Sequence, residues 1–192
     1  MTNLAIFVSG GGTNLENIIR HFADNKDVNI ALVLSNRADA YALVRAKNHH
    51  VPSVVMSRAD FAREDKLMPL MRQYNIDFIV LAGFLLMAPD FLIEAYDRRI
   101  INIHPALLPK YGGKGMYGHH VHEAVKAAGE TETGMTVHYV SSVCDGGEII
   151  AQFSTPLSPD DTPDDIAAKE HVLEQKYFPK VIEELLRDER KL

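Results

Sequence analysis

Hydrophobic residues in the first hundred positions come in short runs, which alternate with longer stretches of mixed polarity. The runs are apolar on nearly every residue, as in strands that are buried on both faces of a parallel sheet. The stretches between them place apolar residues three and four apart, as helices with one buried face do. Alternating strands and helices predict a doubly wound α/β fold. The expected strands are 4–8, 28–34, 51–56, 77–82 and 99–103, and the expected helices are one from residue 13, 40–47, 60–74 and one after residue 89.

The pattern changes after residue 103. Residues 104–118 are rich in Gly, Pro and Lys and predict a long loop of the kind that often belongs to an active site. A helix at 120–128 precedes two strand-like runs at 135–140 and 148–153, which favour an antiparallel extension of the sheet. Thr162 is the expected cap of a final helix, with a proline and two aspartates in its first turn.

Composition narrows the class of protein. The chain has 192 residues, which favours a single domain, and 46% of them are hydrophobic and 24% charged, as in ordinary globular proteins. The net charge of −6 argues against nucleic acid or a membrane surface as a partner. Cys144 is the only cysteine, and the first residues carry no basic leader or long apolar stretch, so we expect a soluble protein of the cytoplasm.

The first turn between strand and helix contains three consecutive glycines, Gly10 to Gly12, followed by Thr13 and Asn14. Glycines let the backbone approach a ligand closely, and the free N–H groups of a helix start attract a phosphate. The turn is not a Walker loop, because no lysine follows the glycines, and Glu16 replaces the third glycine of a dinucleotide motif. The glycine segment alone is compatible with two interpretations: a phosphate-binding site and a tight turn with a purely structural role.

Asn102 and His104 end a buried strand at its carboxyl edge, where open α/β sheets bind ligands. Residues two apart on a strand face the same side, so an amide and an imidazole emerge together. Such a pair can stabilise the oxyanion that a carbonyl oxygen becomes during attack. The alternative is a histidine held in place by a local hydrogen bond.

Asp145, before two glycines, either marks a turn or supplies the carboxylate that orients and charges His104. Its neighbour Cys144 is expected to be a packed thiol, not a nucleophile. His119, His120 and His122 favour a helix start that lines a loop or faces solvent over a metal site, because no further ligand motif accompanies them.

In combination these motifs resemble the folate-dependent phosphoribosylglycinamide formyltransferases over essentially the whole chain. The pairing of Asn-x-His-Pro-x-Leu-Leu-Pro with a downstream Asp-Gly-Gly is specific to folate formyl transfer, and the glycine turn narrows the resemblance further. The matching segments are Ser9-Gly10-Gly11-Gly12-Thr13-Asn14, Leu81-Ala82-Gly83-Phe84, Asn102-Ile103-His104-Pro105-Ala106-Leu107-Leu108-Pro109, and Gly134 with Asp145-Gly146-Gly147.

The resemblance implies the formyltransferase fold: a mostly parallel sheet with helices on both faces and a late antiparallel extension. It implies one domain, 1–192, whose residues 1–103 form a phosphate-binding half and whose residues 104–192 form a folate-binding and catalytic half. It also implies roles by position. The catalytic residues would be Asn102, His104 and Asp145; the ribonucleotide would contact Gly12, Thr13, Asn14 and Glu174; and the folate would contact Arg63, Leu86, Met87, Ala88 and Asn102.

The implied reaction moves the formyl group of 10-formyltetrahydrofolate to the amine of 5-phosphoribosylglycinamide, in de novo purine biosynthesis. It needs no metal and no partner beyond these small molecules, and the protein would be a monomer or a homodimer. The alternatives are a 10-formyltetrahydrofolate hydrolase, a formyltransferase with another amine acceptor, and a phosphate-binding module without catalysis. Formylation of methionyl-tRNA is disfavoured, because it normally goes with a further carboxyl-terminal domain and this chain is acidic.

Overall fold

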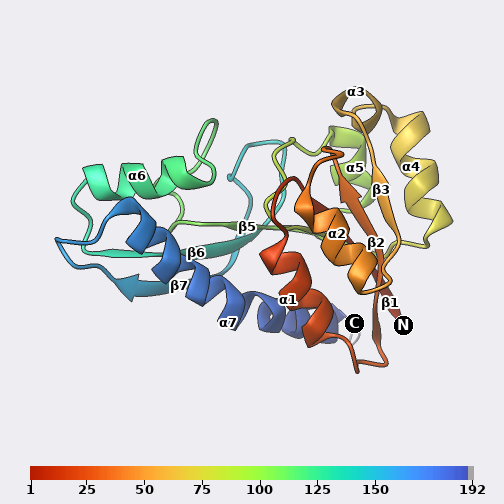
Figure 1. Ribbon diagram of the computed structural model, residues 1–192. Coiled ribbons are helices and arrows are strands. Elements are labelled where there is room, and N and C mark those ends of the chain that lie inside the picture. Colours follow the sequence, from red (N-terminus) through yellow and green to blue (C-terminus); the bar gives the residue numbers. More distant parts are fainter. Residues whose placement is uncertain (190–192) are drawn as a thin grey trace. The chain divides into compact units, whose positions relative to one another are not determined.

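The computed structural model describes residues 1–189, and the chain divides into two compact units, Met1–Asn102 and Ile103–Leu192. The boundary falls within one strand, one residue before the predicted division between the two halves. None of the helices in residues 1–189 combines the length and apolar character that a membrane crossing needs. Each unit is built around its own strands and helices (Figure 1).

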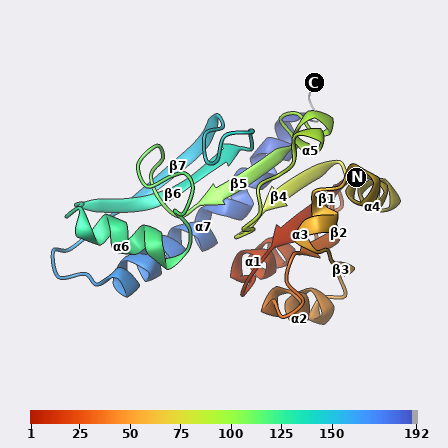
Figure 2. The ribbon, with the colours of Figure 1, turned by 90° about the horizontal axis from the view of Figure 1, so that it is seen from above.

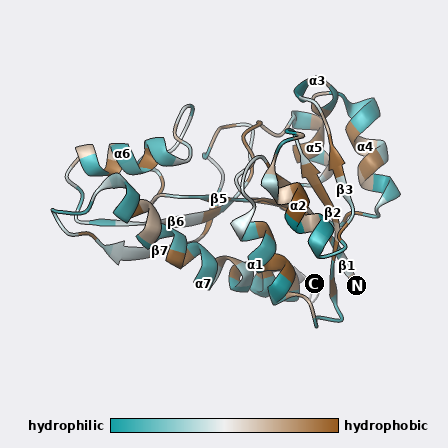
Figure 3. Cartoon of the chain, in the orientation of Figure 1, coloured by the Kyte–Doolittle hydropathy of each residue, from teal (hydrophilic) through white to brown (hydrophobic). Residues whose placement is uncertain are grey.

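The first unit is a parallel sheet in the order β3-β2-β1-β4-β5. Its central strands are apolar on consecutive residues, and Leu4 to Val8 are completely buried. Figure 3 shows β1 and β2 as largely hydrophobic, while the helices carry both colours. The strands are β1 (Thr2–Val8), β2 (Val28–Ser35), β3 (Ser53–Val55), β4 (Phe78–Leu81) and β5 (Ile100–His104).

Helices cover both faces of this sheet, as the doubly wound pattern requires. The chain moves outward from β1 through β2 to β3 and then returns to β4, so right-handed crossovers place successive groups of helices on opposite faces. Figure 2 shows α1 and α2 on one side of the sheet and α4 and α5 on the other. The helices are α1 (Thr13–His21), α2 (Tyr41–Asn48), α3 (Arg58–Phe61), α4 (Glu64–Gln73) and α5 (Asp90–Ala95).

The prediction of one helix over residues 60–74 is wrong, because the structure forms two. The Ser57 side chain accepts a hydrogen bond from the Asp60 N–H at 3.1 Å and starts α3 earlier than expected. Arg63 then adopts extended backbone angles, φ −108° and ψ 119°, and serves as the N-cap of α4. Glu64 and Asp65 follow in the first turn of α4, where negative charge is favourable.

The second unit packs two helices and a hairpin. β6 (Glu132–Tyr139) and β7 (Ile149–Pro156) are antiparallel, and α7 (Pro163–Glu189) packs against both strands and against α6 (His119–Ala127). Figure 1 shows α7 running beside the hairpin, where the Phe153 and Tyr177 rings stack at 4.0 Å. Apolar side chains of α6 and α7, including Val121, Val125 and Ile166, form a buried cluster.

The strand order over the described residues is β3-β2-β1-β4-β5-β6-β7, in which β3 to β5 pair in parallel and β6 and β7 are antiparallel to each other. The predicted fold class, a mostly parallel sheet with a late antiparallel extension, is therefore confirmed.

Thr162 caps the start of α7, as the sequence predicts. The Thr162 N–H donates to Asp165 Oδ2 at 2.9 Å, and the Asp165 N–H donates to Thr162 Oγ1 at 3.2 Å. The two residues thus satisfy each other's exposed backbone donors.

We predict that Thr162→Ala lowers the free energy of unfolding by about 1 kcal/mol, because it removes the acceptor of one of these bonds. Urea denaturation followed by circular dichroism measures the change. Thr162→Ser keeps the hydroxyl and serves as the control. Equal stability of the Ala variant and wild type would show that the cap contributes nothing.

Candidate functional site

The glycine turn lies at the carboxyl end of β1 and opens α1. Gly12 is the N-cap residue of α1 and adopts left-handed angles, φ 75° and ψ 29°. A Cβ at this position would lie 2.6 Å from the Ala42 Cβ, so the turn and α2 approach each other as only glycine allows. No side-chain hydrogen bond caps α1 at Gly12, and a helix start is a position that favours an anion.

Side chains of α1 and α2 hold the turn in place. Arg45 Nε donates to the Gly11 carbonyl at 2.8 Å, and the Ala42 N–H donates to the Gly10 carbonyl at 3.1 Å. Arg45 also pairs with Glu16, which lies 2.8 Å from Arg20 Nη2. The backbone of the turn is therefore preorganised without a ligand.

Two loops at neighbouring strand ends are joined by Ser9. Its N–H donates to the Gly83 carbonyl at 3.1 Å, and its Oγ accepts from the Leu85 N–H at 2.9 Å. Ser9 is 2% exposed, so these bonds are shielded from water. The glycine turn after β1 and the loop after β4 are thus one structure.

The second unit brings His104 and Asp145 together from the end of β5 and the loop before β7. His104 Nδ1 lies 3.6 Å from Asp145 Oδ2, and Nε2 lies 2.7 Å from the carbonyl oxygen of Tyr111. Because a carbonyl oxygen only accepts, Nε2 carries the hydrogen. Only a protonated ring would also present an N–H to Asp145. Asn102 lies two residues earlier on the same strand and is partly exposed.

Burial and the charge of Asp145 shift the pKa of His104 in opposite directions. The ring is 3% exposed, and burial lowers the pKa of His104, with a smaller lowering from His138. The Asp145 charge and the Tyr111 carbonyl act to raise this pKa but do not compensate fully. His104 is therefore neutral near pH 7 in the free protein, with a carboxylate placed to favour its protonation.

Asp145 is held as a carboxylate. Burial acts to raise the pKa of Asp145, but hydrogen bonding to His138 and to the Gly113 N–H, at 2.9 Å, together with the charges of His104 and His138, lowers it overall. His138 Nε2 lies 3.7 Å from Asp145 Oδ1. This arrangement can orient an imidazole and accept a proton, which is the chemistry of a general acid–base site.

The sequence matches the family model described as formyl transferase over residues 2–182. The chain belongs to the formyl transferase family. A phosphoribosylglycinamide formyltransferase of Haemophilus influenzae is 37% identical over 188 residues, which cover 95% of this chain and 86% of the relative. The crystal structure of a phosphoribosylglycinamide formyltransferase from Bacillus halodurans matches with a TM-score of 0.87 at 32% identity, covering 96% of this chain and 95% of that chain.

The chain does not span every relative. A chloroplastic phosphoribosylglycinamide formyltransferase of Arabidopsis thaliana is 37% identical over 185 residues, 93% of this chain but 63% of the plant protein. This formyl transferase therefore covers less than two thirds of that relative's length.

The predicted folate residues of this formyl transferase lie in the first unit. Arg63 caps α4 and pairs with Asp65 at 2.7 Å, while Leu86, Met87 and Ala88 lie in the loop between β4 and α5. Aromatic contacts join the two segments: the Phe61 and Phe84 rings are 5.1 Å apart, and both pack on Phe7. Leu85 and Met87 are 50% and 51% exposed and Ala88 only 7%, so this loop presents two large apolar side chains to its surroundings.

Glu174, the remaining predicted substrate residue, lies on α7. Its side chain is 12% exposed, and its Oε2 lies 3.2 Å from His171 Nδ1. Thr13 is exposed and Asn14 buried at the start of α1. The structure thus groups Gly12 to Asn14 in the first unit and His104, Asp145 and Glu174 in the second.

Sequence reasoning missed several residues that shape the site. The Tyr111 carbonyl, the Gly113 N–H and the His138 ring contact the His104–Asp145 pair. The first two are backbone groups and have no signal in the sequence. His138 does have one, because it is a polar residue in the run expected as a buried strand. Within residues 1–189, no group of three or more His, Cys, Asp or Glu side chains is arranged to hold a metal ion.

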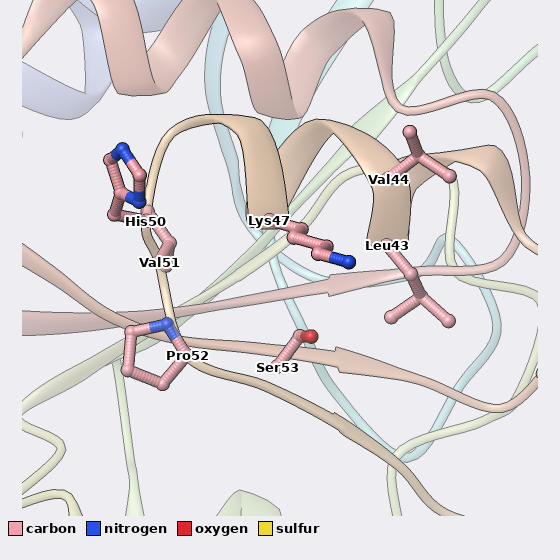
Figure 4. Close-up of a pocket in the computed structure, with 7 residues that line it drawn as sticks. All are labelled: Leu43, Val44, Lys47, His50, Val51, Pro52 and Ser53. Atoms are coloured by element: carbon pink, nitrogen blue, oxygen red, sulfur yellow. The ribbon is translucent and has the colours of Figure 1, made fainter.

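A separate pocket of about 620 Å³ lies between α2 and β3 (Figure 4). It contains none of the predicted site residues. Lys47 and His50 are the only ionisable side chains in its lining, which otherwise consists of Leu43, Val44, Val51, Pro52 and Ser53.

The Cys144 thiol is poorly suited to nucleophilic attack. Burial raises the pKa of Cys144, and the charge of Asp145 and a contact between Sγ and Asp145 Oδ2 at 3.7 Å raise it further. The thiol is therefore protonated at neutral pH, and it is the thiolate that reacts.

We predict that Asp145→Asn speeds alkylation of Cys144 by iodoacetamide at pH 8 by about three- to tenfold, because the thiolate fraction rises when the carboxylate charge is removed. Mass spectrometry follows the reaction without ambiguity, since the chain has one cysteine. Asp164→Asn, which changes a side chain that is 91% exposed, is the matched control. An unchanged rate in Asp145→Asn would contradict the assignment.

Proposed function

We propose that this chain transfers the formyl group of 10-formyltetrahydrofolate to the amine of 5-phosphoribosylglycinamide, a step of de novo purine biosynthesis. The observation that carries the proposal is the buried His104–Asp145 pair, at the end of the strand that bears Asn102, in a chain matching formyl transferases over residues 2–182. The relatives named phosphoribosylglycinamide formyltransferase support the choice of acceptor.

In the proposed reaction the acceptor amine attacks the formyl carbon, and a new C–N bond forms as the carbonyl oxygen becomes an oxyanion. The amide of Asn102 and the ring of His104 donate hydrogen bonds to that oxygen. The oxyanion adds negative charge beside a ring that already faces Asp145, which favours the imidazolium form. Asp145 takes the proton of the amine, directly or through water. As the oxyanion collapses, the bond between the formyl carbon and the folate nitrogen breaks. The proton taken from the amine passes to that nitrogen, so tetrahydrofolate leaves as a neutral amine.

The proposed reaction also requires that the hydrogen bond between His104 and the Tyr111 carbonyl breaks. His104 Nε2 now donates to the Tyr111 carbonyl, while Nδ1 faces Asp145. The oxyanion must therefore replace the Tyr111 carbonyl as the acceptor of the Nε2 hydrogen. Tyr111 has a positive φ of 56°, an uncommon conformation for a residue with a side chain, so its release also relieves backbone strain.

The remaining parts of the proposal concern binding and context. Gly12, Thr13 and Asn14 hold the phosphate of the ribonucleotide, and Glu174 contacts its glycinamide end. Arg63, Leu86, Met87, Ala88 and Asn102 contact the folate. The chain acts as one domain, as a monomer or a homodimer in the cytoplasm, and its partners are these small molecules.

An acceptor screen tests the function directly. The protein is incubated with 10-formyltetrahydrofolate and, in turn, 5-phosphoribosylglycinamide, other amines and buffer alone, and tetrahydrofolate release is measured. Rapid release that requires the ribonucleotide supports the proposal. Release at the same rate in buffer alone would identify a hydrolase, and no release with any acceptor would leave only a binding protein.

We predict that Gly11→Asp weakens 5-phosphoribosylglycinamide binding by at least tenfold, because it places a negative charge at the anion site of the turn. Gly11 is the right position for this change, since a Cβ there meets no atom within 4 Å, whereas at Gly12 it would overlap α2. Isothermal titration calorimetry measures both substrates. Gly11→Asn is the neutral control of equal size. Equal weakening of folate and ribonucleotide binding by Gly11→Asp would refute the assignment.

We predict that Asn102→Ala and His104→Ala each reduce kcat by about 10²–10³, as loss of an oxyanion donor does. Their effects should combine to less than the product of the two, because both act on one charge. Asp145→Asn should reduce kcat severely while both substrates still bind. His120→Ala, at an exposed histidine, is the control. If His104→Ala kept near wild-type turnover, the mechanism would have to be abandoned.

A further inference from the structure

The most unusual ionisable residue of the second unit is Glu170, in the N-terminal half of α7. Its side chain belongs to a residue that is 3% exposed, and its Oε1 has no hydrogen-bond partner. Glutamate is almost never fully buried unless it is paired. Within residues 1–189, Glu170 takes part in no ion pair, so no cation compensates its charge.

Glu170 lies four residues before Glu174, which places the two carboxyl groups side by side on one face of the helix. Burial raises the pKa of Glu170 well above its usual value, and the charge of Glu174 and a hydrogen bond to Glu174 raise it further. Two neighbouring buried carboxylates repel each other, whereas one proton between them removes the repulsion and forms a strong hydrogen bond.

The elements packed against α7 supply no positive charge to Glu170. On α6, His122 is 5% exposed and its Nδ1 has no partner; burial and His119 lower the pKa of His122, so it is neutral at pH 7. On β6, Glu132 is exposed and His138 contacts Asp145, while β7 contains no ionisable residue.

On α7 itself, the nearest basic residues have other partners. Lys169 binds Asp161, and His171 binds Glu174. Protonation is therefore the remaining way to neutralise Glu170.

We propose that Glu170 is a positioning residue for the acceptor: its protonated carboxyl donates a hydrogen bond to the Glu174 carboxylate and fixes it toward the amine end of the substrate. The inference rests on the proposed function, in which Glu174 contacts the glycinamide group. It adds a residue that no sequence motif indicated.

The shared proton also matters for the reaction. A pair with one negative charge attracts the amine end without the second charge that would hold the amine as unreactive ammonium. Glu170 thus acts on substrate binding through Glu174 and touches no reacting atom itself.

Two substitutions separate this role from simple packing. Glu170→Gln keeps a donor of the same shape, whereas Glu170→Met fills similar space without a hydrogen bond. We expect Glu170→Met to raise KM for 5-phosphoribosylglycinamide by about tenfold, as loss of one hydrogen bond to a charged group would. KM for 10-formyltetrahydrofolate and kcat at saturation should stay within about threefold, and Glu170→Gln should restore the acceptor KM to within about threefold of wild type.

Glu184→Met and Glu184→Gln make the same substitutions at an exposed position on the same helix and serve as controls. An unchanged acceptor KM in Glu170→Met would overturn the proposal. Loss of acceptor binding in Glu170→Gln equal to that in Glu170→Met would overturn it too, because the amide would then fail to replace the protonated carboxyl.

The protonation state of Glu170 can be tested without measuring formyl transfer. Above the ordinary pKa of glutamate, about 4.3, the folded protein keeps a proton that the unfolded chain has lost, so this group makes stability fall as pH rises toward its folded pKa. Relative to Glu170→Gln, the unfolding equilibrium constant of wild type should rise by up to about tenfold per pH unit above pH 5. Infrared difference spectra between the two proteins should show a protonated carboxyl band at pH 7.

A flat stability difference together with no such band would show that Glu170 is ionised and would refute the proposal. Failure of the proposed function looks different. In that case wild type itself would not formylate the ribonucleotide, while the pH-dependent stability difference and the infrared band would remain.

Discussion

Burial of the His104 ring is the constraint on which the catalytic half of this protein depends. Two separate loops supply the polar groups around this ring: the Tyr111 carbonyl accepts the hydrogen of Nε2, and the Asp145 carboxylate lies 3.6 Å from Nδ1, where it stabilises the ring once it is protonated. Both residues that supply these partners have positive φ angles, 56° and 52°. Each such conformation costs about 1–3 kcal/mol and persists only where the surroundings compensate it. The shape of both loops is thus tied to one ring.

In the first unit, the structure of the glycine turn depends on how closely its backbone approaches α2. Gly12 packs against Ala42 at the start of α2, and this contact lets the turn after β1 keep its shape with support from Arg45. The same principle acts in the hairpin of the second unit, where any side chain at Gly147 would overlap the Tyr139 carbonyl. In both places a glycine brings the backbone of a functional loop against a regular element.

Four partly or fully buried ionisable groups of the second unit differ in their protonation states. His104 and His122 lose their charge to burial, whereas Asp145 keeps its charge because hydrogen bonds from neighbouring groups outweigh the same effect. Glu170 has no such donors and a carboxylate as its neighbour, so it retains a proton. The local supply of hydrogen bonds, more than the degree of burial, decides which of these groups is charged.

The sequence alone determined the order of the elements and the residue types at their ends. Continuous apolar runs such as Leu4 to Val8 predicted a parallel sheet, and Gly12 and His104 stood out because each breaks a local pattern at a strand end. Local signals did not reveal the break at Arg63, whose extended backbone angles separate α3 from α4. Only the tertiary structure decided that the Tyr111 carbonyl, Gly113 and His138 meet the His104–Asp145 pair. Backbone groups have no residue identity, and the bond from the Gly113 N–H to Asp145 spans 32 positions, which leaves no periodicity. It also decided that Glu170 is buried beside Glu174, because burial depends on which elements pack over a helix face, and spacing along one helix cannot specify that.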